Sequence, residues 1–168
     1  MDAAQLRALQ APFKQHYRDH PEAARVTSLA EAELIPGAIQ VSVAGSSAQA
    51  GLHSATGGDG RLRCSADMLL EALVACAGVT LQAVATAMGI VLRGGRVRAE
   101  GDWDARGTLG VSRDVPVGLT IIRLGFDLDS DATSEQLDRL LELVERYCVV
   151  AQTLRHGVEV RVERGRRS

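Results

Sequence analysis

The feature that most constrains the fold is a long, almost uncharged stretch in the middle of the chain. Residues 65–88, SADMLLEALVACAGVTLQAVATAM, consist mainly of strong helix formers and contain two charged residues, Asp67 and Glu71. A helix that is apolar nearly all round has to be buried. About 20 apolar residues would also span a membrane, but this stretch is rich in alanine and lacks aromatic residues at its ends. We therefore predict a helix in the centre of a globular fold, ending at Gly89.

The composition is that of one ordinary globular domain. The chain has 168 residues, of which 46% are hydrophobic and 24% charged, values that exclude collagen-like and disordered classes. The net charge of -2 and the five aromatic residues argue against nucleic-acid binding. The N-terminus, MDAAQLRALQ, lacks the pattern of a signal peptide. We expect a cytoplasmic protein without a membrane or nucleic-acid partner.

The N-terminal segment has the spacing of an amphipathic helix. Apolar residues recur at steps of three and four: Leu6, Leu9, Phe13 and Tyr17. This spacing predicts a helix over residues 2–18, which Pro12 either kinks or divides in two. We assign residues 1–20 to an N-terminal helical extension and residues 164–168 to a basic tail.

Strand patterns lie on both sides of the central helix. Alternation predicts a β-hairpin over residues 25–43 with its turn at Pro36-Gly37. Residues 45–65, rich in glycine and serine, predict a long loop. Three more strands are expected, at 96–104, 117–127 and 158–163.

A second long helix is expected between the last two strands. The capping box from Thr133 to Gln136 begins it, and Gly157 ends it. Its apolar positions are Leu137, Leu140, Leu141, Val144, Cys148, Ala151 and Leu154. Cys148 is therefore expected on the buried face. Two long helices packed with antiparallel strands make an α+β fold.

Three cysteines, Cys64, Cys76 and Cys148, are too few for a disulfide scaffold and lack the spacing of metal ligands. We therefore expect no metal site. Cys64 precedes the central helix and is either a surface thiol or a second redox partner. Cys76 and Cys148 each lie in a long helix, where a cysteine is commonly a small buried hydrophobe.

The same placement allows a redox function. If the two long helices pack together, Cys76 and Cys148 meet in one apolar cavity. A thiolate there could attack a peroxide, become a sulfenic acid and condense with the second thiol to a disulfide. Residues expected to line the cavity are Leu69, Leu73, Val79 and Leu154.

Such chemistry needs a thiolate, and burial raises the pKa of a thiol. Cys76 lies eleven residues into its helix, beyond the reach of that helix's own N-terminus. We therefore expect a nearby cation to lower the pKa of Cys76. The candidates closest in sequence are Arg61 and Arg63, with Arg18 and Arg25 as further possibilities.

The segments GGDG…SADMLLEALVACAGVTL and ERYCVVAQTLRHGVEVRV make the chain resemble the OsmC/Ohr family, the osmotically inducible and organic-hydroperoxide-resistance proteins, over residues 24–163. The resemblance implies an α+β fold in an intertwined homodimer. It also implies reduction of organic hydroperoxides at the expense of a thiol or dithiol reductant, without metal or organic cofactor. Cys76 matches the cysteine that attacks the peroxide, and Cys148 matches the resolving cysteine.

The chain departs from the family pattern around both cysteines. Ser65-Ala66 replaces a Pro-Glu pair whose acid steadies the activating arginine, and Asp67, one position later, could substitute for that acid. The family arginine falls near Thr56, in a segment that lacks one. Val149 replaces a proline that is common after the second cysteine. A non-catalytic dimeric binding protein or a thiol redox sensor is the alternative function.

Overall fold

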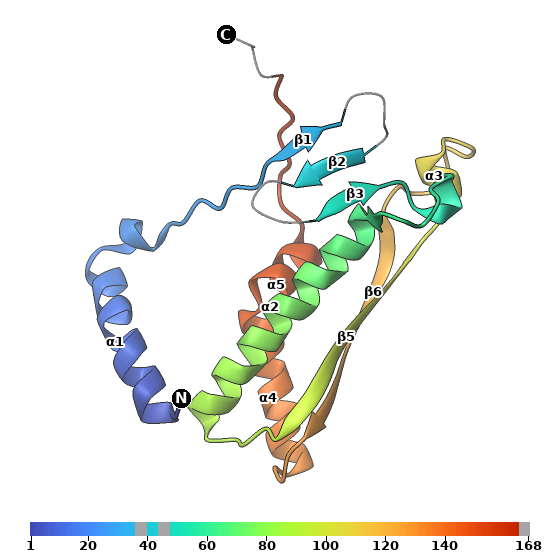
Figure 1. The fold of residues 1–168 in the computed structure, drawn as a ribbon. Coiled ribbons are helices and arrows are strands. Elements are labelled where there is room, and N and C mark those ends of the chain that lie inside the picture. Colours follow the sequence, from blue (N-terminus) through green and yellow to red (C-terminus); the bar gives the residue numbers. More distant parts are fainter. Residues whose placement is uncertain (36–39, 44–47, 165–168) are drawn as a thin grey trace.

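The computed structural model describes residues 1–35, 40–43 and 48–164 and combines helices with two small sheets (Figure 1). The helices are α1 (Ala3–Asp19), α2 (Ser65–Met88), α3 (Ala105–Thr108), α4 (Ser134–Tyr147) and α5 (Val149–His156), with 3-10 turns η1 (Pro21–Ala24) and η2 (Ser54–Thr56). The strands are β1 (Ala32–Leu34), β2 (Gln40–Val43), β3 (Gln49–Gly51), β4 (Arg63–Cys64), β5 (Gly94–Trp103) and β6 (Leu119–Asp129).

The first sheet has the strand order β1-β2-β3-β4. Strands β1 and β2 form the predicted antiparallel hairpin, whose Pro36-Gly37 turn lies outside the described residues. The predicted loop over 45–65 is wrong in part, because β3 pairs antiparallel with β2 and parallel with β4. The glycine- and serine-rich composition hid these two short strands.

The second sheet is a long twisted hairpin of β5 and β6, which runs beside α2 (Figure 1). Its side chains alternate: Val97, Ala99, Leu124 and Phe126 pack toward the helices, while charged residues occupy the opposite face. Arg123 on that face pairs with Asp102, with Nη1 and Oδ2 2.6 Å apart. One apolar and one charged face is the usual pattern of an antiparallel sheet.

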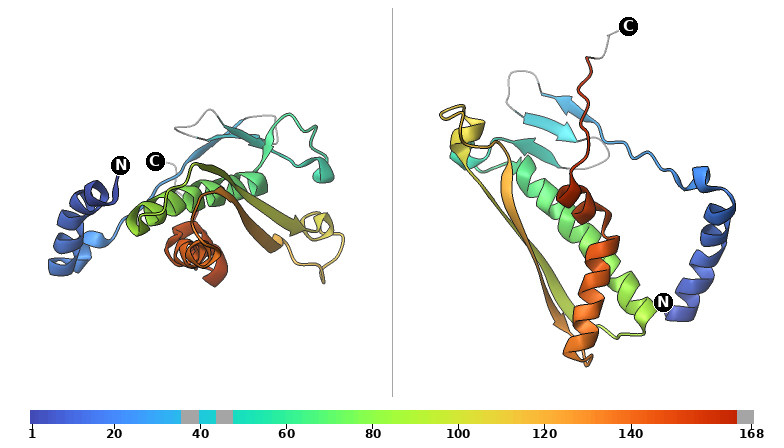
Figure 2. Two further views of the ribbon diagram at one scale, coloured as in Figure 1. Left: turned by 90° about the horizontal axis from the view of Figure 1, so that it is seen from below. Right: turned by 180° about the vertical axis from the view of Figure 1, so that it is seen from behind.

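Helix α2 crosses the middle of the fold and packs against β5 and against the C-terminal helices α4 and α5 (Figure 2). Its bounds confirm the predicted helix over 65–88. Gly89 caps it with a φ of 72°, a left-handed conformation that favours glycine. Four residues at steps of four form its buried face: Leu73, Ala77, Leu81 and Ala85.

The expectation that α2 is buried all round is wrong for this chain taken alone. Val79 is 72% exposed and Leu69 40% exposed. By length and composition α2 could cross a membrane, yet it packs against β5, α4 and α5. The structure therefore favours a core helix with one apolar face left uncovered.

The second long helix is broken, contrary to the sequence prediction. It begins at the predicted capping box, in which the Gln136 N–H donates to Thr133 Oγ1 at 3.2 Å. At Cys148 the backbone leaves the helical region, with φ -73° and ψ 107°. The Gln152 side chain spans the break, because its Nε2 donates to the Glu145 carbonyl oxygen at 2.8 Å. Cys148 thus ends α4 and precedes α5.

The two ends of the chain differ from the sequence predictions in one helix and one strand. Helix α1 is continuous through Pro12 and packs on α2, with Leu6 as its buried residue. The predicted strand over 158–163 is not formed in the single chain. Its valines, Val158, Val160 and Val162, are 65%, 80% and 94% exposed.

Candidate functional site

The structure brings Cys76 and Cys148 together, as the sequence predicts. The two side chains are neighbours: each affects the pKa of the other, and both belong to one apolar cluster with Leu73 and Ala77. Cys148 is completely buried, whereas Cys76 is partly exposed. The two thiols therefore share one apolar environment, but peroxide has readier access to Cys76.

The break at Cys148 places the beginning of α5 against the Cys76 sulfur. The backbone N–H groups of Val149 and Val150, at the beginning of α5, lower the pKa of Cys76, and the Thr80 hydroxyl from the next turn of α2 has the same effect. The first N–H groups of any helix lack partners within the helix. They carry partial positive charge and favour an anion. The site thus stabilises a thiolate at Cys76 with backbone dipoles.

These contacts separate the pKa values of the two thiols. Burial raises the pKa of Cys76, but hydrogen bonds from Val150, Cys148, Val149 and Thr80 outweigh it, and the net pKa lies below the ordinary cysteine value. Burial is also the largest influence on Cys148, and the neighbouring Cys76 charge adds to it, so that the pKa of Cys148 is raised. Cys76 therefore ionises first while Cys148 keeps its proton.

The predicted supporting residues lie elsewhere. Arg61 is exposed and its Nε lies 3.5 Å from Asp59 Oδ2, while Arg63 Nη1 lies 2.6 Å from Glu71 Oε2. Asp67 is exposed in the first turn of α2. Cys76 is nine residues beyond Asp67, about 14 Å along the helix axis.

Within the described residues of this single chain, neither Arg61 nor Arg63 is among the groups that lower the pKa of Cys76. In the part of the chain that the structure describes, backbone amides take the place expected for Arg61 or Arg63. One feature of the sequence could have predicted these backbone amides. Proline is favoured at the first position of a helix, and the family proline at the position of Val149 indicates that a helix begins there.

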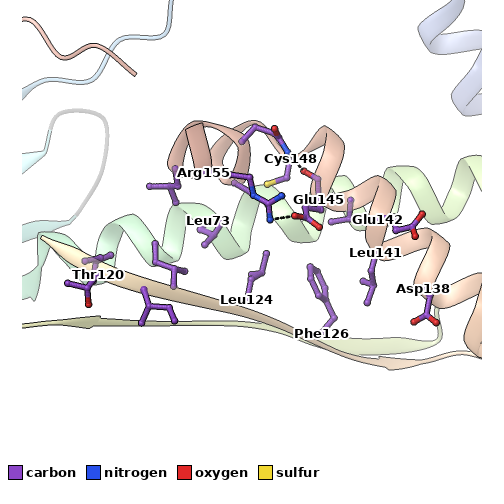
Figure 3. Close-up of a pocket in the computed structure, with 17 residues that line it drawn as sticks. Leu73, Thr120, Leu124, Phe126, Asp138, Leu141, Glu142, Glu145, Cys148 and Arg155 are labelled. Carbon is purple, nitrogen blue, oxygen red and sulfur yellow. Dashed lines mark hydrogen bonds and ion pairs between the residues drawn. The ribbon is translucent and has the colours of Figure 1, made fainter. Parts of the chain in front are cut away.

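A cavity of about 770 Å³ lies between β6 and the C-terminal helices (Figure 3). Apolar side chains supply much of its lining, among them Leu73, Leu124, Phe126, Leu141 and Leu154. Cys148 also lines it, and the ion pair between Arg155 and Glu145 lies beside this cysteine. Of the residues predicted to line one cavity, Cys148, Leu73 and Leu154 do so, whereas Cys76, Leu69 and Val79 are not part of its lining.

The third cysteine is separate from this site. Cys64 lies in β4, immediately before α2, about 18 Å along the helix from Cys76. Among the described residues, no three histidine, cysteine or acidic side chains gather as metal ligands. The candidate site therefore consists of Cys76, Cys148, Thr80 and the first turn of α5.

Solved structures of low sequence identity share this fold. An OsmC-like protein from Mycoplasma pneumoniae is 16% identical with a TM-score of 0.65, over 79% of this chain and 89% of that one. An OsmC-like protein of unknown function from Vibrio cholerae is 13% identical with a TM-score of 0.61, over 77% and 94%. A Legionella pneumophila organic hydroperoxide resistance protein OsmC is 17% identical with a TM-score of 0.54, over 79% and 91%. These likenesses confirm the α+β, OsmC-like fold.

No curated protein matches the sequence. A family model described as OsmC-like protein matches residues 58–163, more than half of the chain. The matched segment contains both paired cysteines, the whole of α2 and the break at Cys148. The chain belongs to the OsmC-like protein family.

Proposed function

We propose that this protein reduces organic hydroperoxides, with Cys76 as the attacking thiolate and Cys148 as the resolving thiol. The observation that carries the proposal is the contact of Cys76 with both Cys148 and the first turn of α5. The amides favour the thiolate, and the thiolate is the nucleophilic form of cysteine. Family membership supports the same assignment.

The reaction balances with these two sulfurs and an external reductant. The Cys76 thiolate attacks one peroxide oxygen, the O–O bond breaks, and the alkoxide takes up a proton to become an alcohol. Cys76 is then a sulfenic acid. The Cys148 sulfur attacks it, losing its proton, and the released hydroxide leaves as water while a disulfide forms. A dithiol reductant supplies two electrons by thiol–disulfide exchange and restores both thiols.

The coupling between the thiols sets the order of these steps. In the reduced site the Cys76 charge helps to raise the pKa of Cys148. Oxidation converts that charge to a neutral sulfenic acid and removes this contribution. Burial then remains as the influence that raises the pKa of Cys148, and the N–H groups of Ala151 and Val150 lower it. The resolving thiol is thereby activated after the peroxide has reacted.

The apolar surroundings favour a substrate with a hydrocarbon group. The cavity beside Cys148 has room for one, and such cavities bind ligands mainly through apolar contact. The Legionella neighbour is named for organic hydroperoxide resistance, which supports the same substrate class. We propose that the alkyl group occupies this cavity.

We also propose that the protein is a cytoplasmic homodimer. Val79 on α2 and Val149 on α5 are 72% and 71% exposed, and the alternating tail over 158–163 has no strand partner in the single chain. Exposed apolar surface of this kind marks an interface. Light scattering after size exclusion should give twice the chain mass, whereas a monomer at micromolar concentration would contradict the proposal.

Peroxide consumption tests the function. The wild type should reduce cumene hydroperoxide repeatedly in the presence of a dithiol. Cys76→Ser should lose this activity, while Cys148→Ser should reduce about one equivalent and stop. Equal turnover by the wild type and Cys76→Ser would exclude the mechanism, and a single oxidation of the wild type without turnover would favour a thiol sensor.

A further inference from the structure

Two exposed histidines lie on one face at the C-terminal end of α1. His16 is in the last turn of the helix, and His20 is its C-cap residue, whose N–H donates to the His16 carbonyl oxygen at 2.8 Å. Residues four apart are neighbours on the surface of a helix. The centres of the two imidazole rings are 5.1 Å apart, and the ring planes are inclined at 46°. The helix therefore brings the two rings together in solvent.

The separation of the rings is that of two imidazoles that share one metal ion. A zinc ion lies about 2.0–2.1 Å from a histidine nitrogen, and therefore about 3.2 Å from the centre of the ring. Two such distances and a ring separation of 5.1 Å make an angle of about 105° at the ion, close to the tetrahedral angle of about 109° that zinc adopts. The positions of the two rings thus suit one bound ion.

The groups around the two rings also favour a cation. The C-terminal end of a helix carries partial negative charge. Glu22 Oε1 lies 3.7 Å from His20 Nδ1, and histidines that bind metals commonly turn their second nitrogen toward a carboxylate. This arrangement leaves Nε2 of His20 for the ion. Arg18, two residues from each histidine, lies on another face, where its Nη2 donates to Gln15 Oε1 at 2.7 Å.

The other two histidines of the chain are engaged within the fold. His53 Nδ1 accepts a hydrogen bond from the backbone two residues further on, at 3.0 Å. His156 Nε2 lies 3.1 Å from Gln152 Oε1. Among the residues that the structure describes, His16 and His20 are the one pair of histidines whose rings are in contact.

We propose that His16 and His20 form a binding site for a divalent transition-metal ion, and zinc is the ion that fits the ring geometry. Imidazole nitrogen also suits copper and nickel. Over the described part of the chain no third histidine, cysteine or acidic ligand joins the pair, so water completes the coordination. Such a site exchanges its ion with solvent, unlike the closed four-ligand sites of structural zinc. It lies outside the OsmC-like segment 58–163 and is independent of hydroperoxide reduction.

The test is a titration of the full chain with zinc ions, followed by NMR at the ring protons of its four histidines. The signals of His16 and His20 should shift together with one midpoint, whereas those of His53 and His156 should stay in place. Zinc has no redox chemistry, so it leaves the thiols reduced. The zinc is supplied in excess over the three cysteines, which keeps binding by thiols from setting the midpoint.

Single variants test whether both rings bind the same ion. His16→Ala should raise the zinc concentration at the midpoint of the His20 shift by at least about tenfold, the smaller end of the losses that follow removal of a group supporting a metal site. His20→Ala should have the same effect on His16. Both changes replace exposed side chains by alanine, the best helix former, so α1 should remain folded. His156→Ala is the matched control and should leave the midpoint unchanged.

Two results would overturn the inference. One is an equal midpoint for the His20 shift in the wild type and in His16→Ala, which would mean that the rings do not share an ion. The other is the absence of a shift at either ring in millimolar zinc. The titration contains no peroxide, so its outcome is separate from that of the peroxide assay.

Discussion

Val149→Pro tests the activation of Cys76 by backbone amides. The substitution removes one N–H that lowers the pKa of Cys76. It should otherwise be tolerated, because Val149 is the first residue of α5, where proline is favoured. Cys148 before it is already extended, with φ -73° and ψ 107°, close to the conformation that a following proline requires. The Val149 side chain is 71% exposed in the single chain, so little packing within the subunit is lost, and Val149→Ala controls for contacts across the proposed dimer interface.

The expected effect follows from the value of one hydrogen bond. A bond to a charged group contributes roughly 1.5–3 kcal/mol, and about 1.4 kcal/mol corresponds to one pKa unit. The pKa of Cys76 should therefore rise by about 1–2 units. Below the midpoint, each unit lowers the thiolate fraction tenfold, and alkylation slows by the same factor.

The assay is the alkylation rate of Cys76 between pH 5 and 10, with thermal melting as a check on folding. Val149→Ala is the matched control, because it shortens the same exposed side chain but keeps the N–H. Its midpoint should equal that of the wild type and lie below the ordinary cysteine value. The same midpoint for Val149→Pro and Val149→Ala would show that the Val149 N–H does not lower the pKa of Cys76.

Three further predictions concern the packing, the surface charges and the resolving thiol. Leu140→Ala empties a fully buried position between α4 and α2 and should lower the free energy of unfolding by about 2–5 kcal/mol in urea titrations; a loss below about 1 kcal/mol would contradict this packing. Arg63→Ala removes an exposed ion pair with Glu71 and should change stability by less than about 1 kcal/mol. It should also leave the pH midpoint of Cys76 alkylation unchanged. An upward shift of this midpoint would show that Arg63 lowers the pKa of Cys76. Cys148→Ser should leave a sulfenic acid at Cys76 that dimedone traps after peroxide treatment, and absence of the adduct would argue against Cys76 as the attacking residue.

The elements that could be predicted from sequence are those with strong local signals. An almost uncharged run and a terminal glycine gave the bounds of α2, and a capping box gave the beginning of α4. The strands β5 and β6 followed from alternation. The meeting of Cys76 and Cys148 followed from their places in the two longest helical patterns.

The remaining features depend on interactions that a local pattern does not contain. Apolar spacing continues through Cys148, and therefore the break that exposes the α5 amides was hidden in the sequence. The search for a cation near Cys76 then followed from treating this segment as one helix. The tail over 158–163 has strand spacing, but a strand forms only with a neighbouring strand, and the described part of this single chain supplies none.

If Cys76 and Cys148 form one redox pair, peptide mass spectrometry after one equivalent of cumene hydroperoxide should detect the bond between them. We expect a disulfide-linked peptide that joins these two residues, with Cys64 still alkylatable. Over-oxidised Cys76 beside an unmodified Cys148, or a linkage through Cys64, would contradict it.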